Sequence, residues 1–299
     1  MSSISLLSNA KINLFFSIDA LRPDGYCDVS SIILPINFSD QLVFSRIRTA
    51  SEAPSTVEIE IQRHHPDFNP SKNTIRTAID LFQRATGVAK VALGVNVEKN
   101  IPMGGGFGGG SSNAIRTLDA LNYLHGHILS ESDYLRIAQQ IGTDCSFFIK
   151  NCPQLARGRG DMLCPLPKSF CENLASHFLL IFRFPFSIST PWAYEQFKKN
   201  PIFNPNAKAM LEQILSSQTF ENIAYNAFQD LIFAHYPEMR SLFETLKSHG
   251  YHPSLTGSGS GCFIIHRNKN FLEAAKAIIS KYLAKPSLLE LTTFKLPNK

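Results

Sequence analysis

The stretch PMGGGFGGGSSNA, residues 102–114, places six glycines in seven positions around Phe107. It follows a strand-like run, VALGVNV at 91–97, and leads into apolar residues at helical spacing that continue to Gly126. Glycine lets backbone N–H groups approach a ligand closely, and the start of a helix adds unpaired N–H donors and a partial positive charge. A flexible linker is the alternative, but a linker has no reason to join a strand directly to an amphipathic helix. The sequence therefore predicts a loop that binds a phosphate chain.

The better known phosphate loops do not fit this stretch. A P-loop ends in Gly-Lys-Ser/Thr, and no lysine lies between Lys99 and Lys150. Gly104, Gly106 and Gly109 match G-x-G-x-x-G, but a Rossmann loop follows the first strand and has an acid about 20 residues later, where this chain has Leu129. The His-Arg-Asp and Asp-Phe-Gly strings of protein kinases are absent from the sequence. A phosphate loop of another class remains.

The length and charge of the chain limit the number of domains and the kind of ligand that it can bind. The chain has 299 residues, 44% hydrophobic and 18% charged, which is long enough for two domains with separate cores. Its net charge of +5 comes from scattered basic residues, with no Lys/Arg-rich run, so we expect an anionic small molecule rather than nucleic acid as the partner.

Neither a membrane segment nor a disulfide framework is expected. No unbroken apolar run approaches about 18 residues, and the first 18 residues lack the basic start of a signal peptide, so we expect a cytoplasmic protein. The cysteines show no CxxC pair and no zinc-site spacing, which favours reduced thiols over disulfides or metal ligands; they are Cys27, Cys145, Cys152, Cys164, Cys171 and Cys262.

Strand-like and helix-like patterns alternate along the chain and indicate an α+β fold in two domains. Residues 71–86 and 130–142 read as helices, the second with a capping box formed by Ser130 and Asp133. TDCSFFI at 143–149 reads as an acidic loop residue followed by a strand. The Cys/Pro/Gly/Arg-rich stretch 151–168 is the expected boundary, which gives domains of residues 1–155 and 156–299.

One strand near the start carries two polar residues on the same face. In AKINLFFSI, residues 10–18, strand alternation places Lys11, Asn13 and Phe15 together. A cation and an amide therefore point the same way.

Four motifs, in order from about residue 9 to 265, resemble the GHMP kinases, the superfamily of galactokinase, homoserine kinase, mevalonate kinase and phosphomevalonate kinase. The glycine stretch resembles their second motif. NAKINLFFSI followed by RPDGY at 9–26 resembles the first motif, and SLTGSGSGCFII at 254–265 resembles the third motif. The fourth match is IGTDCSFFI at 141–149.

The resemblance implies a two-domain kinase with a β-rich, ATP-binding N-terminal domain and a smaller α+β C-terminal domain. ATP is the implied phosphoryl donor, with Mg²⁺. The motifs are most similar to a branch whose acceptor is a cytidyl-diphosphate sugar alcohol: it phosphorylates the 2-hydroxyl of cytidyl-diphosphate-linked methylerythritol in non-mevalonate isoprenoid (terpenoid) synthesis.

The resemblance also implies roles for residues. Asp144 matches the catalytic base, and Lys11 would lower the proton affinity of the reacting groups and offset phosphoryl charge. The hydroxyl of Ser111 or Ser112 would approach Mg²⁺ or else serve as an N-cap. The ATP-binding residues would be Pro102, Met103, Gly104, Gly105, Gly106, Phe107, Gly108, Gly109, Gly110, Ser111 and Ser112.

Acceptor recognition would need stacking and hydrogen bonds at the edge of the base. Asn13 would hydrogen-bond the acceptor, Tyr26 and Tyr194 would supply aromatic rings, and Thr190 matches a family Thr-Pro. Gly257, Ser258 and Gly259 would close over phosphate. The position after Tyr26 is Cys27, where the family usually has a histidine that helps to read cytosine; a backbone contact survives this change, whereas an imidazole contact does not.

Two other departures are Asn9 in place of Pro, and Cys145-Ser146 in place of Val-Pro. Three alternatives therefore stay open. One is a paralogue that acts on another small alcohol, another is a catalytically dead nucleotide-binding protein, and the third is a basic RNA-binding module.

Overall fold

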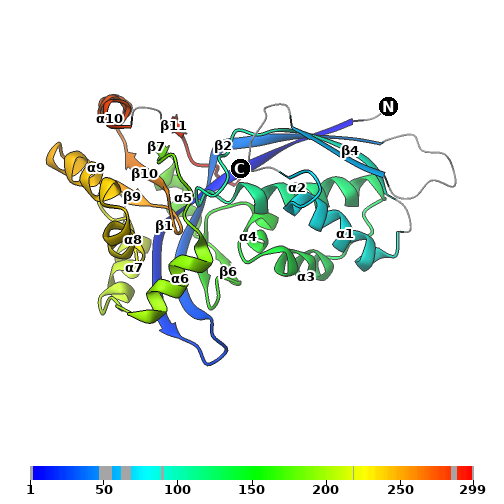
Figure 1. The fold of residues 1–299 in the computed structure, drawn as a ribbon, viewed down its shortest axis with the longest axis horizontal. Helices are drawn as coiled ribbons and strands as arrows, with labels where there is room; N and C mark the ends of the chain where they lie inside the picture. Colours follow the sequence, from blue (N-terminus) through cyan, green and yellow to red (C-terminus); the bar gives the residue numbers. More distant parts are fainter. Residues whose placement is uncertain are drawn as a thin grey trace. The chain divides into compact units, whose positions relative to one another are not determined.

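The computed structural model describes residues 3–46, 56–61, 69–88, 91–217, 219–283 and 288–297. Its chain forms two compact units that interleave along the sequence (Figure 1). The first unit contains Met1–Ala10, Phe38–Met103 and Gly108–Asn151, and the second contains Lys11–Asn37, Gly104–Phe107 and Cys152–Lys299. The division at residue 155 expected from the sequence stays a prediction.

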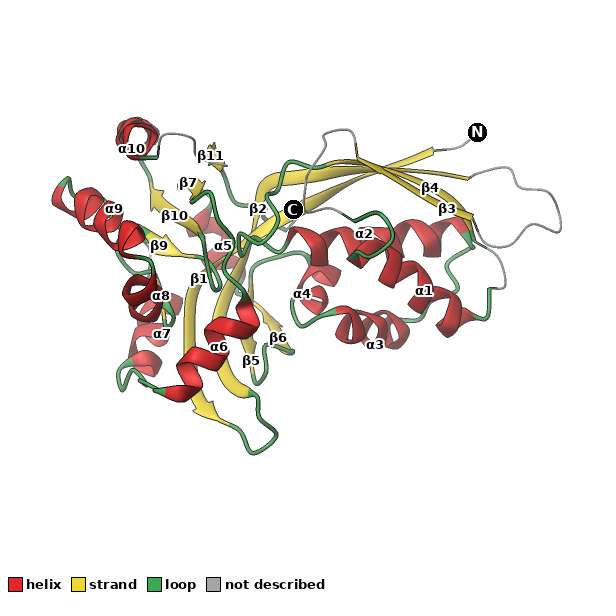
Figure 2. Ribbon diagram, in the orientation of Figure 1, coloured by secondary structure: helices red, strands yellow, loops and turns green. Residues whose placement is uncertain are grey.

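The first unit pairs strands with a group of helices. β2 (Cys27–Arg46) runs antiparallel to β4 (Ala92–Glu98), and β4 runs parallel to β3 (Thr56–Ile61). Every second residue of β4 is buried, so one face of this sheet packs inward. Figure 2 shows the helices gathered on one side of β3 and β4; they are α1 (Thr74–Thr86), α2 (Gly109–Leu124), α3 (Glu131–Ile141) and α4 (Cys145–Lys150).

The strand β1 (Ser3–Leu21) crosses from the first unit into the second at Lys11. In the second unit β8 (Tyr225–Asn226) pairs with β1 in parallel. A hairpin of β5 (Gln154–Arg157) and β6 (Met162–Pro165) pairs with β2 through β5. A four-stranded sheet has the order β11 (Leu288–Thr292), β7 (Phe178–Arg183), β10 (Gly261–His266), β9 (Ser254–Leu255). Among the residues that the structure describes, this unit also contains six helices: α5 (Lys168–Leu174), α6 (Thr190–Lys199), α7 (Ala207–Ser216), α8 (Gln229–His235), α9 (Pro237–Ser248) and α10 (Lys269–Tyr282).

The α+β class is confirmed. The capping box of α3 is present as predicted, because the Ser130 hydroxyl accepts from the Asp133 N–H and the Asp133 side chain accepts from the Ser130 N–H. The strand predicted after Asp144 is wrong: Cys145–Lys150 is the short helix α4. Four consecutive residues, Cys145 to Phe148, are buried, so the segment lacks the alternation of a half-buried strand, and a short apolar run alone does not separate a strand from a buried helix.

None of the helices in the described part of the chain is long and apolar enough to cross a bilayer.

A buried carboxylate fastens the segment that enters the glycine loop. Asp40 is fully buried and accepts hydrogen bonds from the Lys99 ammonium at 2.7 Å, the Ile101 N–H at 2.7 Å, the Asn100 N–H at 2.8 Å and the Asn113 side-chain amide at 3.0 Å. Burial lowers the pKa of Lys99, and Asp40 opposes this shift. The carboxylate thus joins β2, the segment after β4 and α2 inside the first unit.

We predict that Asp40→Asn lowers the free energy of unfolding by about 3 kcal/mol, because it leaves the Lys99 ammonium buried without its counter-ion. Urea unfolding followed by circular dichroism measures the change. Glu195→Gln is the matched control, since it breaks the exposed Glu195–Lys199 pair and should cost less than about 1 kcal/mol. Equal losses in the two variants would contradict the prediction.

A buried histidine joins three segments of the second unit. His177 lies between α5 and the strand β7, and only 1% of it is exposed. Its Nδ1 lies 3.1 Å from the Asn173 carbonyl oxygen, and its Nε2 accepts from the Arg267 Nε at 3.3 Å and the Phe220 N–H at 3.4 Å. This network requires the neutral ring with the proton on Nδ1. Burial is the main reason that the pKa of His177 is lowered; Arg267 acts in the same direction, whereas Glu221 opposes the shift.

We expect this lowered pKa to make stability fall with acidity. The unfolded chain takes up a proton near the ordinary pKa of about 6.5, whereas the folded chain resists it, so the stabilisation is complete above that pH and is lost as the pH falls below it. Thermal unfolding between pH 7.5 and 5 measures the slope. His177→Gln should flatten the decline, and the exposed His249→Gln should not; identical slopes would contradict the assignment.

Candidate active site

The glycine loop, defined as Pro102–Ser112, is held through its carbonyl groups. In the second unit, the Gly105 carbonyl accepts from the Gly261 N–H at 3.1 Å, and the Phe107 carbonyl accepts from the Lys11 N–H at 2.9 Å. The Thr256 hydroxyl lies 3.4 Å from the Gly106 carbonyl oxygen. These are ordinary trans peptides, in which C=O and N–H point in opposite directions.

The N–H groups that share these three peptides, on Gly106, Phe107 and Gly108, therefore point away from the strands that hold the loop. Successive N–H groups on one side of a loop form an anion site. At the end of the loop begins α2, whose first N–H groups have no intrahelical partner and carry partial positive charge. This arrangement suits a phosphate chain.

Two glycines, Gly106 in the loop and Gly261 in the strand facing it, leave no room for a side chain. Gly106 has φ +75°, and a Cβ atom on it would lie 2.3 Å from the Thr256 carbonyl oxygen. On the other side of the contact, a Cβ atom on Gly261 would lie 2.1 Å from the Gly105 carbonyl oxygen. The second and third motifs therefore touch through bare backbone.

Neither serine of the loop caps α2, because the N-cap is Gly108, in the left-handed conformation. Ser112 is 1% exposed, and its hydroxyl has no hydrogen-bond partner among the residues that the structure describes. Burial raises the pKa of the Cys145 thiol to about 12, although the neighbouring Ser111 side chain acts to lower it, so this thiol stays neutral and packs as a core group.

The link between Ser111 and Cys145 brings the start of α4 to the start of α2 within the first unit. Asp144 immediately precedes Cys145 and is the N-cap residue of α4. Its side chain makes no capping hydrogen bond within the described structure.

Lys11 and Asn13 lie together as strand alternation predicts. The Lys11 ammonium donates to the Asn13 side-chain oxygen at 2.7 Å, and the Asn13 side-chain amide donates to the Ser31 hydroxyl at 2.9 Å. The Asn13 backbone N–H donates to the Thr256 hydroxyl at 3.1 Å. Lys11 is 4% exposed, so Asn13 orients a buried cation beside the third motif.

The predicted acceptor residues belong to the second unit, and two of them meet. The Thr190 hydroxyl, in the first turn of α6, lies 2.9 Å from the Ser258 hydroxyl. The Gly257 carbonyl accepts from the Asn226 side-chain amide at 2.9 Å. This buried asparagine also bonds the Leu255 carbonyl, and it fixes the approach to the third motif.

The aromatic residues differ in their surroundings. Tyr26 is 54% exposed, and the Arg159 guanidinium lies 4.8 Å from its ring centroid. Tyr194 is half-buried and meets the Phe228 ring edge-on at 5.0 Å. Cys27 is buried in the hydrophobic core, and burial raises the pKa of its thiol. The Cys27 side chain therefore faces the core.

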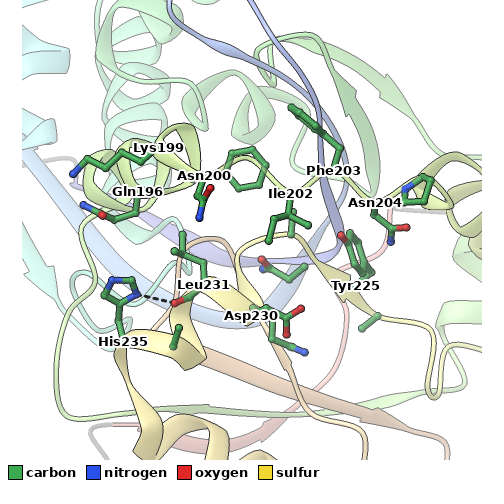
Figure 3. A pocket seen from close by; sticks show the side chains of 17 residues that line it. Gln196, Lys199, Asn200, Ile202, Phe203, Asn204, Tyr225, Asp230, Leu231 and His235 are labelled. Atoms are coloured by element: carbon green, nitrogen blue, oxygen red, sulfur yellow. Dashed lines mark hydrogen bonds between the residues drawn. The ribbon is translucent and has the colours of Figure 1, made fainter.

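A separate cavity of about 770 Å³ lies among α6, β8 and α8 (Figure 3). Its lining includes Phe203, Tyr225 and Asp230, together with Asn226, which bonds the third motif. None of the predicted site residues lines this cavity.

Asn226, Arg159 and Thr256 are neighbours of the site that the sequence did not indicate, although Thr256 lies inside the third motif.

Comparison with known proteins agrees with this geometry. The family models named "GHMP kinases N terminal domain" and "GHMP kinases C terminal" match residues 73–151 and 206–285. A protein of Sulfurihydrogenibium sp. is 32% identical over 95% of this chain and 98% of its own length. The chain therefore belongs to the GHMP kinase family, whose members are phosphotransferases.

The Sulfurihydrogenibium protein is named 4-diphosphocytidyl-2-C-methyl-D-erythritol kinase. A chloroplastic enzyme of the same name from Arabidopsis thaliana is 28% identical over 89% of this chain and 67% of its own. A crystal structure of 4-(cytidine 5'-diphospho)-2C-methyl-D-erythritol kinase matches with a TM-score of 0.76 at 24% identity, covering 97% of this chain and 99% of that one. The mevalonate kinase of Methanococcus jannaschii shares the fold, with a TM-score of 0.73 at 16% identity over 99% of both chains.

We predict that Gly106→Ala lowers kcat/KM for ATP by about 100-fold or more, because a side chain at this left-handed position displaces the loop from Thr256. Gly250→Ala is the matched control: Gly250 has φ +82°, and a Cβ atom on it would have nothing within 4 Å. It should keep kcat/KM within about twofold. Circular dichroism checks that both variants fold, and a folded Gly106→Ala protein with unchanged kinetics would contradict the prediction.

Proposed function

We propose that the protein transfers the γ-phosphoryl group of ATP to the 2-hydroxyl of 4-diphosphocytidyl-2-C-methyl-D-erythritol. The observation that carries the proposal is the glycine loop, whose carbonyl groups are bonded to the second unit so that three N–H groups remain for phosphate. The name shared by relatives about 30% identical over most of the chain supports this acceptor.

The glycine loop holds the triphosphate, with the segment before it bordering the adenosine. The buried, unpartnered Ser112 hydroxyl and the neighbouring Ser111 suit the hard-oxygen chemistry of Mg²⁺. The described residues contain no cluster of His, Cys, Asp or Glu for a metal, so the ion would be held chiefly by nucleotide oxygens and water. When bound, Mg²⁺ neutralises phosphate charge.

Asp144 is the proposed general base. The acceptor O–H proton passes to its carboxylate, the oxygen forms a bond to the γ-phosphorus, and the bond from that phosphorus to the β-phosphate oxygen breaks, which releases ADP. The buried Lys11 ammonium, oriented by Asn13, would offset the charge of the transferring phosphoryl group.

The acceptor's cytosine stacks on Tyr26, with Tyr194 as the second aromatic group, and the backbone of Cys27 meets the edge of the base. Thr190, Gly257 and Ser258 contact its phosphates; the bond between Thr190 and Ser258 supports their joint role.

A second candidate is phosphorylation of a different alcohol by the same machinery. It is favoured by Cys27, because the side chain at this position is buried in the core and supplies no polar contact to a base. The phosphate loop, Lys11 and Asp144 are unaffected by this difference.

Release of ADP from ATP and Mg²⁺ tests the proposal, with 4-diphosphocytidyl-2-C-methyl-D-erythritol compared with mevalonate, homoserine and galactose. We expect turnover only with the cytidyl compound and a loss of about 100-fold or more in kcat for Asp144→Asn. Asp80→Asn, an exposed residue of α1 in the same unit, should stay within about twofold. Turnover with another alcohol would favour the second candidate, and ATP binding without any turnover would contradict both.

A further inference from the structure

A buried arginine lies directly beneath the glycine loop. Arg183 is the last residue of β7, where it pairs with Gly261 of β10 and Leu288 of β11. Only 8% of it is exposed. A Cβ atom on Gly105 would lie 3.0 Å from its Cδ and 3.2 Å from its Nε, so the guanidinium arm lies against the backbone of the loop.

The arginine continues to a second contact with the same loop. Its Nη2 donates to the Ser187 hydroxyl at 2.8 Å. That hydroxyl oxygen would lie 2.4 Å from a Cβ atom on Gly104, the preceding residue of the loop. Arg183 and Ser187 together therefore contact two consecutive glycines. A side chain on Gly104 would collide with Ser187, and one on Gly105 would press tightly against Arg183.

The carbonyl contacts of Gly105, Gly106 and Phe107 hold the same loop, and one of them comes from Gly261, the strand partner of Arg183. The side-chain contacts of Arg183 and Ser187 and these backbone contacts therefore act together on the loop. A guanidinium stays charged throughout the physiological pH range, and its charge acts over a longer range when it is removed from water. Arg183 therefore places a positive charge against the backbone of the loop.

We propose that Arg183, with Ser187, is a positioning residue for phosphoryl-donor binding: it holds Gly104 and Gly105 in the phosphate-binding conformation and supplies positive charge beneath the bound phosphates. This inference rests on the proposed function, because it assigns the glycine loop to the ATP phosphates. It adds a residue from β7, far from the glycine loop in the sequence, to the determinants of nucleotide affinity.

Calorimetric titration of the full chain with ATP, ADP and AMP tests the inference without any acceptor. Arg183→Met keeps most of the apolar stem and removes the charge, so we expect the Kd for ATP to rise about tenfold or more, with a smaller rise for AMP. Arg183→Lys should recover most of the ATP affinity. Ser187→Ala should weaken ATP binding less than Arg183→Met. Arg240→Met, on an exposed position of α9 in the same unit, is the matched control and should leave all three Kd values unchanged.

A purely structural role gives a different pattern. If Arg183→Met lowers the melting temperature while its folded fraction binds ATP as the wild type does, or weakens AMP and ATP equally, the inference is overturned. A rise confined to the KM of the acceptor alcohol also overturns it. Wild-type protein that binds ATP and phosphorylates none of the tested alcohols would remove the proposed acceptor and leave this inference standing, so the two failures are distinguishable.

Discussion

Contact between two stretches of bare backbone is the constraint on which the site depends. Gly261 donates its N–H to the Gly105 carbonyl, and a side chain on either Gly106 or Gly261 would collide with backbone oxygen of the other motif. The consequence is directional: once the carbonyl groups of consecutive peptides are bonded to one side, their N–H groups face the other side. The glycine-rich composition thus permits close packing, and under the proposed function it also permits phosphate binding. A more flexible glycine loop would have to be ordered each time phosphate binds, at a cost in affinity.

Buried charge surrounds this loop, and each buried cation has a defined polar neighbour. Lys11 bonds the Asn13 amide, Arg183 bonds the Ser187 hydroxyl, and Lys99 bonds the Asp40 carboxylate. The Lys99–Asp40 ion pair lies in the segment that leads into the loop, and the hydrogen bonds of Lys11 and Arg183 to neutral side chains hold these two cations in place.

The parts of this arrangement that depend on local pattern could be predicted from the sequence. Strand alternation placed Lys11 beside Asn13, the capping box set the start of α3, and the run of glycines indicated a loop that opens the helix α2. Phosphate binding by this loop stays a prediction. The helix α4 could not be predicted, because four consecutive buried residues carry no periodic signal. Arg183 and Asp40 were missed for another reason: their importance arises from strand pairing and close approach between segments distant in the sequence.

Cys27 was expected at the acceptor, and its side chain proves to belong to the core, which only the packing of Phe16, Val29 and their neighbours reveals.

The most direct test of phosphate binding by the glycine loop is a two-dimensional ¹H–¹⁵N NMR spectrum of its backbone amides. It is recorded with and without a non-hydrolysable ATP analogue and Mg²⁺. Formation of hydrogen bonds to phosphate should move the N–H proton signals of Gly106, Phe107 and Gly108 strongly downfield, because these are the groups that the bonded carbonyls direct away from the second unit's strands. The Gly250 signal, from a glycine of similar φ outside the loop, should not move. Saturating binding of the analogue without any shift at Gly106, Phe107 and Gly108 would show that the phosphates bind elsewhere and would contradict the assignment of this loop.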